Sequence, residues 1–147
     1  MYSMIEIMSM QLQAQQLNLK YPPEFLTMPR QLLAEIFNGY GPDHWQQHHR
    51  ELLSWFFRHY PTPAAIHDLR YEFSDGFEVT RKAADAEFAA NLLTIWKSRY
   101  KYTRWINIIA WYDLWKIRTA ARLTACCSRY AWREAARKRK NGVINYE

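Results

Sequence analysis

The chain has 147 residues, of which 49% are hydrophobic and 16% aromatic, and it contains only four glycines. This length predicts one domain with a substantial core, and the composition excludes a disordered chain and is typical of a helix-rich globular protein. The net charge of +6 is uneven: residues 97–147 carry thirteen basic and three acidic residues, whereas residues 1–96 carry seven and eleven. The basic half is therefore either solvated throughout or faces an anionic partner. The candidate partners are a lipid surface, an acidic protein and nucleic acid.

The cysteines and the apolar segments indicate the compartment. Cys126 and Cys127 are the only cysteines, and adjacent cysteines rarely form a disulfide, which favours a reducing compartment. Residues 1–6 have neither the basic start nor the apolar stretch of a secretory signal, so no signal peptide is expected. The most apolar window, residues 105–115, is too short for a membrane span and contains Asp113, so no transmembrane segment is expected.

The first half of the chain predicts short helices separated by proline-rich and glycine-rich segments. Pro22, Pro23 and Pro29 favour extended backbone, and Gly39 and Gly41 favour a helix stop. In chain order the pattern predicts a helix over 2–17, an extended segment over 18–29, a helix over 29–37, a loop over 38–43 and a helix over 44–59 capped by Asp43.

The second half predicts longer helices. Thr62 is expected to cap a helix that starts at Pro63 and ends near Phe73, and Thr80 is expected to cap a helix over 81–98. In the latter helix, apolar residues recur every four positions and predict a buried stripe of Ala84, Phe88, Leu92 and Trp96. Neither Pro nor Gly occurs from Arg104 to Lys140, which predicts one long helix or two in line, ended by Asn141 and Gly142.

These elements predict an all-α fold: a single compact helical domain over 1–147. Residues 1–20 are expected to form an N-terminal helix or arm, and residues 21–98 a helical core that includes an antiparallel helix pair. Residues 99–141 are expected to form a long basic and aromatic C-terminal helix or helix pair. Helical spacing places most of the apolar members of this last region on one side and predicts a core stripe of Trp105, Ile108, Ile109, Tyr112, Trp115 and Ile117.

The polar residues of the antiparallel pair form the main candidate site. His67 and Tyr71 are four residues apart and therefore share one helix face, with Asp68 one step round. If the two helices pack antiparallel across the turn at 74–76, Asp85 reaches His67, accepts its second ring proton and raises its basicity. The spacing therefore predicts either a general base or a satisfied polar network in the core.

The residues around these positions resemble two families. The motif His-Asp-x-x-Tyr, followed by an Asp on a second helix, is similar to the catalytic core of phospholipase A₂, and Arg81, Asp85 and Phe88 look like a pattern in its bacterial forms. Over residues 21–112 the chain resembles a family of small uncharacterised phage and prophage proteins. That resemblance rests on the segments Pro23–Thr27, Met28–Arg30, Ala64–Tyr71 and Thr80–Phe88.

The phospholipase resemblance implies a calcium-dependent hydrolase that acts on carboxylic ester bonds of lipids. It implies that His67 activates water, Asp85 orients His67, Tyr71 bonds to the carboxylate and Asp68 helps to hold calcium, which prefers oxygen ligands. The phage resemblance implies a location in the cytoplasm of the infected bacterial host or on the virion.

A non-catalytic role is the alternative to the hydrolase. Calcium in the phospholipases also needs carbonyls from a Gly-rich loop shortly before the histidine, and here the nearest Gly-containing segment, 38–43, is separated from His67 by the helix predicted over 44–59. The alternative is a structural or host-interaction phage protein that keeps the His-Asp-Tyr network for core stability.

Two further clusters of polar residues are candidate binding sites. His44 and His48, with Glu51 on the same face, have spacing that suits zinc, but Trp45 stands where a zinc hydrolase has its catalytic Glu, so a polar helix face is the preferred interpretation. The basic end of the chain predicts binding to an anionic lipid or protein, with nucleic acid as a second alternative and a solvated helix end as the simplest explanation. Its members are Arg129, Arg133, Arg137, Lys138, Arg139 and Lys140.

Overall fold

The computed structural model describes residues 2–37, 59–103 and 105–141, and within these ranges the chain forms helices and no strands. The all-α prediction is confirmed. The helices are α1 (Met4–Gln16), α2 (Glu24–Thr27), α3 (Arg30–Ile36), α5 (Pro61–Glu72), α6 (Glu78–Arg99) and α7 (Ile108–Lys140). The predicted loop over 38–43, almost all of the predicted helix over 44–59, and His44, His48 and Glu51 lie outside the described residues.

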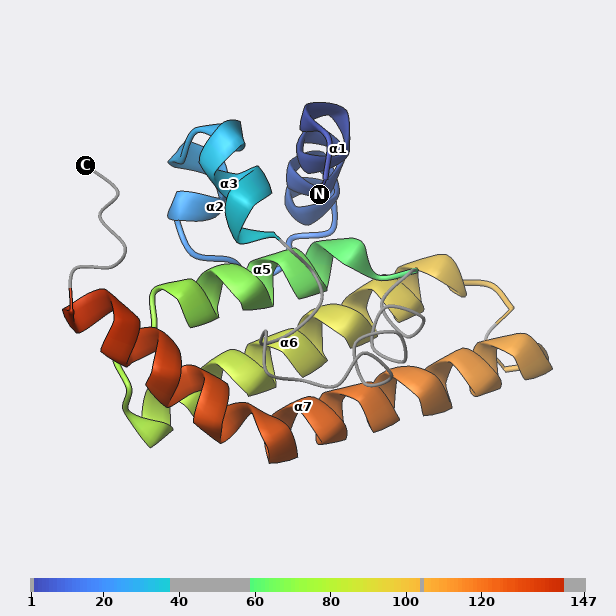
Figure 1. The fold of residues 1–147 in the computed structure, drawn as a ribbon. Coiled ribbons are helices and arrows are strands. Elements are labelled where there is room, and N and C mark those ends of the chain that lie inside the picture. Colours follow the sequence, from blue (N-terminus) through green and yellow to red (C-terminus); the bar gives the residue numbers. More distant parts are fainter. Residues whose placement is uncertain (1, 38–58, 104, 142–147) are drawn as a thin grey trace.

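The three N-terminal helices form a layer over α5 (Figure 1). α1 begins with a capping box, in which Ser3 and Glu6 satisfy each other's backbone amides. The side chains of Ile7, Phe25 and Leu33 are completely buried in this layer, and burial of side chains of this size stabilises the fold by about 1.5–3 kcal/mol each.

The extended segment predicted over residues 18–29 is wrong in part, because it contains the single-turn helix α2. Pro23 is the N-cap residue of this helix, and a proline at the start of a helix removes no hydrogen bond that the helix would otherwise make. The turn buries Phe25, whose burial outweighs the preference of the prolines for extended backbone.

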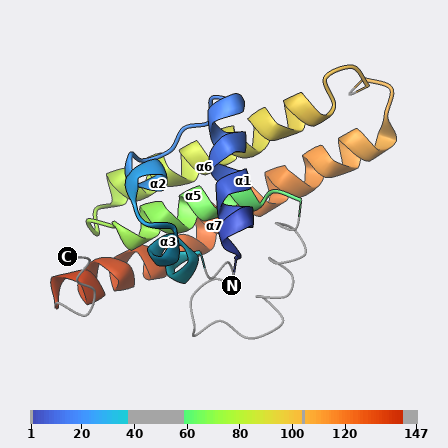
Figure 2. The same ribbon diagram turned by 90° about the horizontal axis from the view of Figure 1, so that it is seen from above.

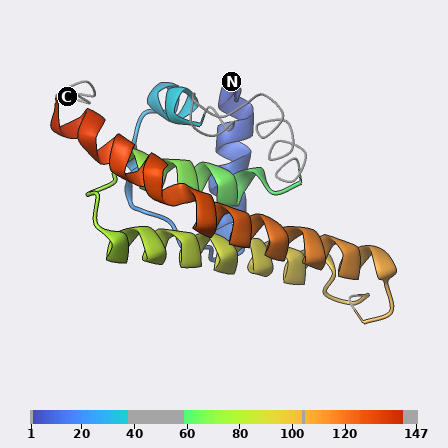
Figure 3. The ribbon, with the colours of Figure 1, turned by 60° about the horizontal axis from the view of Figure 1, so that its bottom comes forward.

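α5, α6 and α7 form the second layer, in which each helix runs opposite to the one before it (Figures 1 and 2). α6 and α7 make the most extensive contact of any helix pair in the described part of the chain. Figure 3 shows α7 lying along α6, with its C-terminal turns extending past the first turn of α6. The predicted stripe on α6 is confirmed, since Ala84, Phe88, Leu92 and Trp96 are all buried.

The predicted N-caps of α5 and α6 and the predicted start of α7 are wrong. α5 starts at Pro61, and Thr62 instead donates its hydroxyl proton to Gln13 of α1. α6 starts at Glu78, and the Thr80 hydroxyl donates to Asp75 and to the Phe77 carbonyl. In both cases a tertiary or turn partner competes successfully for the hydroxyl. α7 starts at Ile108 instead of near Arg104, with Asn107 as its cap.

The core stripe predicted on α7 is also wrong. Of its six members only Ile117 is buried, while Trp105, Ile108, Ile109, Tyr112 and Trp115 are exposed. The face of α7 that packs inward carries alanines and polar side chains together with Leu114, Ile117 and Trp132, and the alanines allow a close approach to the neighbouring helices. The buried residues of this face are Ala110, Asp113, Leu114, Lys116, Ile117, Ala120, Ser128, Trp132 and Ala136.

Buried polar side chains connect the two layers. The Asn91 amide donates to the Lys20 carbonyl at 2.7 Å and accepts from the Lys20 backbone N–H at 2.9 Å. Within the N-terminal layer, Gln11 of α1 donates to the Phe25 carbonyl of α2 at 2.7 Å and accepts from Arg30 Nε of α3 at 3.1 Å. No helix in the described ranges is long and apolar enough to span a membrane.

Candidate functional site

His67, Tyr71 and Asp85 meet between α5 and α6, as their spacing predicts. His67 Nε2 lies 3.1 Å from Asp85 Oδ1, and the Tyr71 hydroxyl donates to the same oxygen at 2.9 Å. His67 and Tyr71 are one turn apart on α5, and Asp85 lies near the middle of the first half of α6. The predicted contact is confirmed.

The second carboxylate oxygen of Asp85 is held by residues that the sequence did not identify as partners. Arg81 Nη1 donates to Asp85 Oδ2 at 2.5 Å, and the Ser128 hydroxyl donates to the same oxygen at 3.2 Å. Arg81 Nη1 also donates to the Ser128 hydroxyl oxygen and to the Ala125 carbonyl of α7. Asp85 therefore joins three helices. We call His67, Tyr71, Arg81, Asp85 and Ser128 the Asp85 network.

Arg81 is paired on its other side by Glu78. Its Nε and Nη2 donate to the two Glu78 carboxylate oxygens at 3.0 and 2.7 Å, a bidentate geometry. Hydrogen bonds from Arg81 lower the pKa of Glu78 to about 2, and the nearby charges of Arg81 and Arg129 act in the same direction. The guanidinium is thus fixed between a partly exposed carboxylate, that of Glu78, and a buried one, that of Asp85. Its hydrogen bonds to Ser128 and to the Ala125 carbonyl hold the start of α6 against α7.

Burial and hydrogen bonding set the charge state of the network. The side chains of Arg81, Asp85 and His67 are 5%, 7% and 11% exposed. Burial raises the pKa of Asp85, but hydrogen bonds from His67 and Tyr71 and the charge of Arg81 outweigh it, so the pKa lies below its usual value. Burial and the nearby Asp85 charge raise the pKa of Tyr71. At neutral pH Asp85 is therefore a carboxylate and Tyr71 a neutral donor.

The His67 ring is enclosed mainly by aromatic side chains. Its centroid lies 4.3 Å from that of Tyr71 and 4.7 Å from that of Phe88. The edge of Tyr71 meets Trp132 of α7 at a centroid distance of 4.8 Å. Because the Asp85 carboxylate faces Nε2, that nitrogen carries the ring proton in neutral imidazole, and Nδ1 keeps its lone pair.

This arrangement has the chemical features of a general base. A carboxylate that accepts the proton of one ring nitrogen orients the imidazole and stabilises the imidazolium that forms when the other nitrogen takes a proton. It also has the features of a core network, because all the partners of Asp85 are fixed by packing. Both interpretations of the sequence motif are compatible with the geometry.

Asp68, which the phospholipase resemblance implies as a calcium ligand, belongs to no cluster of metal-ligating side chains in the described ranges. Asp68 is half-buried on α5, one step round from the His67 face. Among the described residues no three His, Cys, Asp or Glu side chains gather closely enough to hold a metal ion, whereas Ca²⁺ takes six to eight oxygen ligands. The side-chain donors that the phospholipase resemblance implies are thus not clustered in these ranges.

The six cations predicted to bind an anionic partner are all exposed on the second half of α7. Arg129 lies 3.5 Å from Glu78 and Arg137 lies 3.0 Å from Glu134, so part of this charge is compensated. Arg133, Arg137 and Lys140 line an open groove of about 350 Å³ beside Gly76 and Phe77. The structure therefore places three of the predicted cations together and spreads the others round the helix end.

A second buried carboxylate, Asp113 of α7, fixes the other end of the helix pair. The hydroxyls of Tyr100 and Tyr60 donate to its Oδ2 at 2.8 and 3.4 Å, and Lys116 Nζ lies 2.7 Å from Oδ1. Arg99 adds a contact at 3.6 Å. The sequence around Asp113 gave no sign of this role, because three of these four partners lie outside α7.

Comparison with known proteins adds no further constraint on the site. No protein-family model, curated protein or solved structure matches the chain.

Proposed function

We propose that this protein hydrolyses a carboxylic ester, with His67 as the general base. The observation that carries the proposal is the hydrogen bond between His67 Nε2 and Asp85 Oδ1, with Tyr71 bound to the same oxygen. The likeness of His67, Asp68 and Tyr71 to the His-Asp-x-x-Tyr motif of phospholipase A₂ supports a lipid ester as the substrate class, and the phage resemblance supports action during infection.

The reaction follows from the chemistry of the dyad. His67 Nδ1 takes a proton from a water molecule, whose oxygen attacks the ester carbonyl carbon. Asp85 stabilises the resulting imidazolium through Nε2–H, and Tyr71 holds the Asp85 oxygen in place. The imidazolium then gives its proton to the alkoxide as the carbon–oxygen bond breaks, and the products are a carboxylic acid and an alcohol. Each proton taken up by His67 is thereby returned.

The test is hydrolysis of p-nitrophenyl butyrate and of phosphatidylglycerol by the wild type, His67→Gln and His59→Gln. His59 is exposed and is the matched control for the weak ester hydrolysis of any surface imidazole. We expect His67→Gln to lose about 10²–10⁴-fold in kcat, the usual contribution of a general base, and His59→Gln to retain full activity. Each assay is run with CaCl₂ and with EDTA, since the resemblance implies a calcium requirement. Equal activity of all three proteins would contradict the assigned role.

The second candidate is a non-catalytic protein whose Asp85 network stabilises the core. Arg81 and Ser128 favour it, because they saturate Oδ2 of Asp85 and join α6 to α7. In this case neither substrate is hydrolysed, yet Asp85→Ala lowers the unfolding temperature strongly. Hydrolysis lost with an unchanged unfolding temperature in His67→Gln supports the enzyme, whereas stability lost in the absence of any hydrolysis supports the core role.

A further inference from the structure

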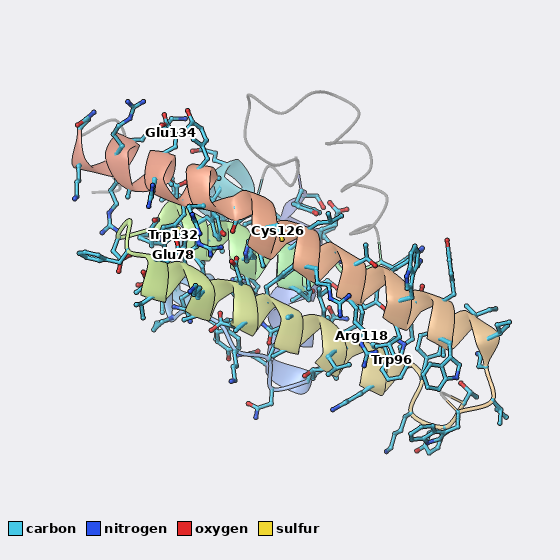
Figure 4. All side chains as sticks on the ribbon, turned by 90° about the horizontal axis from the view of Figure 1, so that it is seen from below. Glu78, Trp96, Arg118, Cys126, Trp132 and Glu134 are labelled. Atoms are coloured by element: carbon cyan, nitrogen blue, oxygen red, sulfur yellow. The ribbon has the colours of Figure 1, made fainter. Side chains whose placement is uncertain are left out.

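The connection between α6 and α7 exposes a concentration of large apolar side chains. Ile106 is 88% exposed, Ile108 83% and Trp105 73%. These residues lie at the end of the helix pair, away from α1, α2 and α3 (Figures 1 and 2), and ring side chains extend outward around this end in Figure 4. We call this surface the α6–α7 tip; it consists of Tyr102, Trp105, Ile106, Ile108, Ile109, Trp111, Tyr112 and Trp115.

The backbone of the tip is ordered by its own hydrogen bonds. The indole of Trp96 donates to the Ala110 carbonyl at 2.8 Å, and the N–H groups of Ile106 and Asn107 donate to the Thr103 carbonyl. Asn107 then caps α7 through the Ile109 amide. The isoleucines are therefore held outward by a fixed turn, and exposed apolar surface of this kind marks an interaction site.

The charge around the tip restricts its partner. Close to the tip, the sequence over residues 97–118 contains six Lys and Arg and one acidic residue, Asp113. Asp113 is buried, and Lys116 lies 2.7 Å from it, so it adds no negative charge to the surface. Two copies of the chain joined symmetrically through this tip would bring like charges together. The partner must offer both negative charge and an apolar phase.

The shape and residue types distinguish a lipid surface from nucleic acid. The tip is a projecting turn with apolar side chains on consecutive positions, whereas a nucleic-acid platform presents aromatic faces and cations along a groove. Isoleucine has no group that hydrogen-bonds to a base or a phosphate, whereas burial of its side chain among acyl chains is favourable in free energy. Trp and Tyr are the residues enriched where a protein meets the headgroup region of a bilayer.

We infer that the α6–α7 tip inserts into the interface of an anionic lipid bilayer, with Trp and Tyr at headgroup level and Ile106 and Ile108 among the acyl chains. Lys97, Lys101 and Arg118 supply cations near the tip. The inserted element is a helix connection, and binding of this type is peripheral. The inference stands on the exposed tip alone and does not depend on ester hydrolysis.

The test is co-sedimentation of the full chain with vesicles of phosphatidylcholine, with and without phosphatidylglycerol. The variants are Ile106→Glu and the control Ile5→Glu, which makes the same change of charge at an exposed site on α1. We expect binding to the phosphatidylglycerol vesicles that weakens about tenfold or more in Ile106→Glu and stays within about twofold of wild type in Ile5→Glu. In a second measurement the vesicles carry brominated acyl chains, which quench the fluorescence of tryptophans that they contact. We expect quenching in the wild type under the conditions in which it binds the vesicles.

Three results would overturn the inference. The first is wild-type protein that does not bind the anionic vesicles, and the second is an equal loss of binding in both variants. The third is a self-association or single-stranded DNA binding that Ile106→Glu abolishes while vesicle binding persists. Sedimentation velocity and a DNA titration at low salt provide these last readouts.

Discussion

Arg81 and Asp85 lie one turn apart on α6 and form an ion pair in which both side chains are buried. Such a pair has a large desolvation cost, which is offset only when the remaining hydrogen-bonding capacity of both groups is satisfied. Both side chains have further hydrogen-bond partners here. Glu78 and the Ala125 carbonyl accept from Arg81. His67, Tyr71 and Ser128 donate to Asp85. The pair is thus stable in its context and costly to break from one side.

Removal of Arg81 should therefore be strongly destabilising. We expect Arg81→Met to lower the free energy of unfolding by about 3–5 kcal/mol, since it leaves a buried carboxylate without its cation. The measurement is urea unfolding followed by circular dichroism. Lys82→Met is the control, because Lys82 is the exposed neighbour of Arg81, and it should change stability by no more than about 0.5 kcal/mol. Similar losses in the two variants would contradict the prediction.

Acid should destabilise the fold through Asp85. The pKa of Asp85 is lower in the folded chain than its ordinary value of 3.8, so the unfolded chain takes up the proton first as the pH falls. The stabilisation is complete above the ordinary pKa and is lost as the pH falls through the lower, folded one. We expect Asp85→Asn to flatten the decline in unfolding free energy below about pH 4. Urea titrations of both proteins between about pH 2 and pH 6 measure the two slopes, and parallel curves would exclude this contribution.

Asn91 should control the attachment of the N-terminal layer. Asn91 is buried, its amide bonds to both backbone groups of Lys20 in a partly buried contact, and Asn91→Leu would remove both hydrogen bonds. We expect a loss of about 1–3 kcal/mol in unfolding free energy and faster hydrogen exchange at the Lys20 amide. Ser98→Ala, at an exposed position of the same helix, serves as the control. Unchanged exchange at Lys20 in Asn91→Leu would contradict the proposed attachment.

Gly76 should resist replacement for two reasons. Its φ of +83° is strained for any residue with a Cβ, and an added Cβ would lie 3.2 Å from Ala136 Cβ of α7. We expect Gly76→Ala to lower the unfolding free energy by about 1–2 kcal/mol or more, measured by thermal denaturation. Lys138→Ala, at an exposed position near the same end of α7, should be close to neutral. A neutral Gly76→Ala would show that the turn adapts without cost.

The elements that were predictable from the sequence are those whose signal is local. A four-residue period identified the buried face of α6, and the i, i+4 spacing of His67 and Tyr71 with a short turn predicted their contact with Asp85. The caps at Thr62 and Thr80 were mispredicted because their hydroxyls have competing partners in Gln13 and Asp75, which propensity does not include.

The parts that could not be predicted depend on which face of α7 meets α6. Periodicity identifies faces but does not rank them when one carries large aromatic residues and the other carries alanines. The pattern predicts the aromatic face as core, whereas the alanine-containing face packs inward, and this is why the sequence does not reveal Ser128 as a partner of Asp85. The signal that would have found it is the row of Ala110, Leu114, Ile117 and Ala120, which continues to Ser128, Trp132 and Ala136.

The continuity of α7 fixes an angular relationship between its two ends. At about 100° per residue, the twenty residues from Ile108 to Ser128 turn the helix through about 2000°, which leaves the two side chains about 160° apart and about 30 Å apart along the axis. Since Ser128 faces Asp85 in the core, a side chain about 160° away, such as that of Ile108, faces solvent. A single residue inserted between them would rotate one end by about 100° and move it by about 1.5 Å. The number of residues between Ile108 and Ser128 therefore determines both the direction and the separation of the two side chains, so an insertion or deletion in α7 would disrupt one of the two ends.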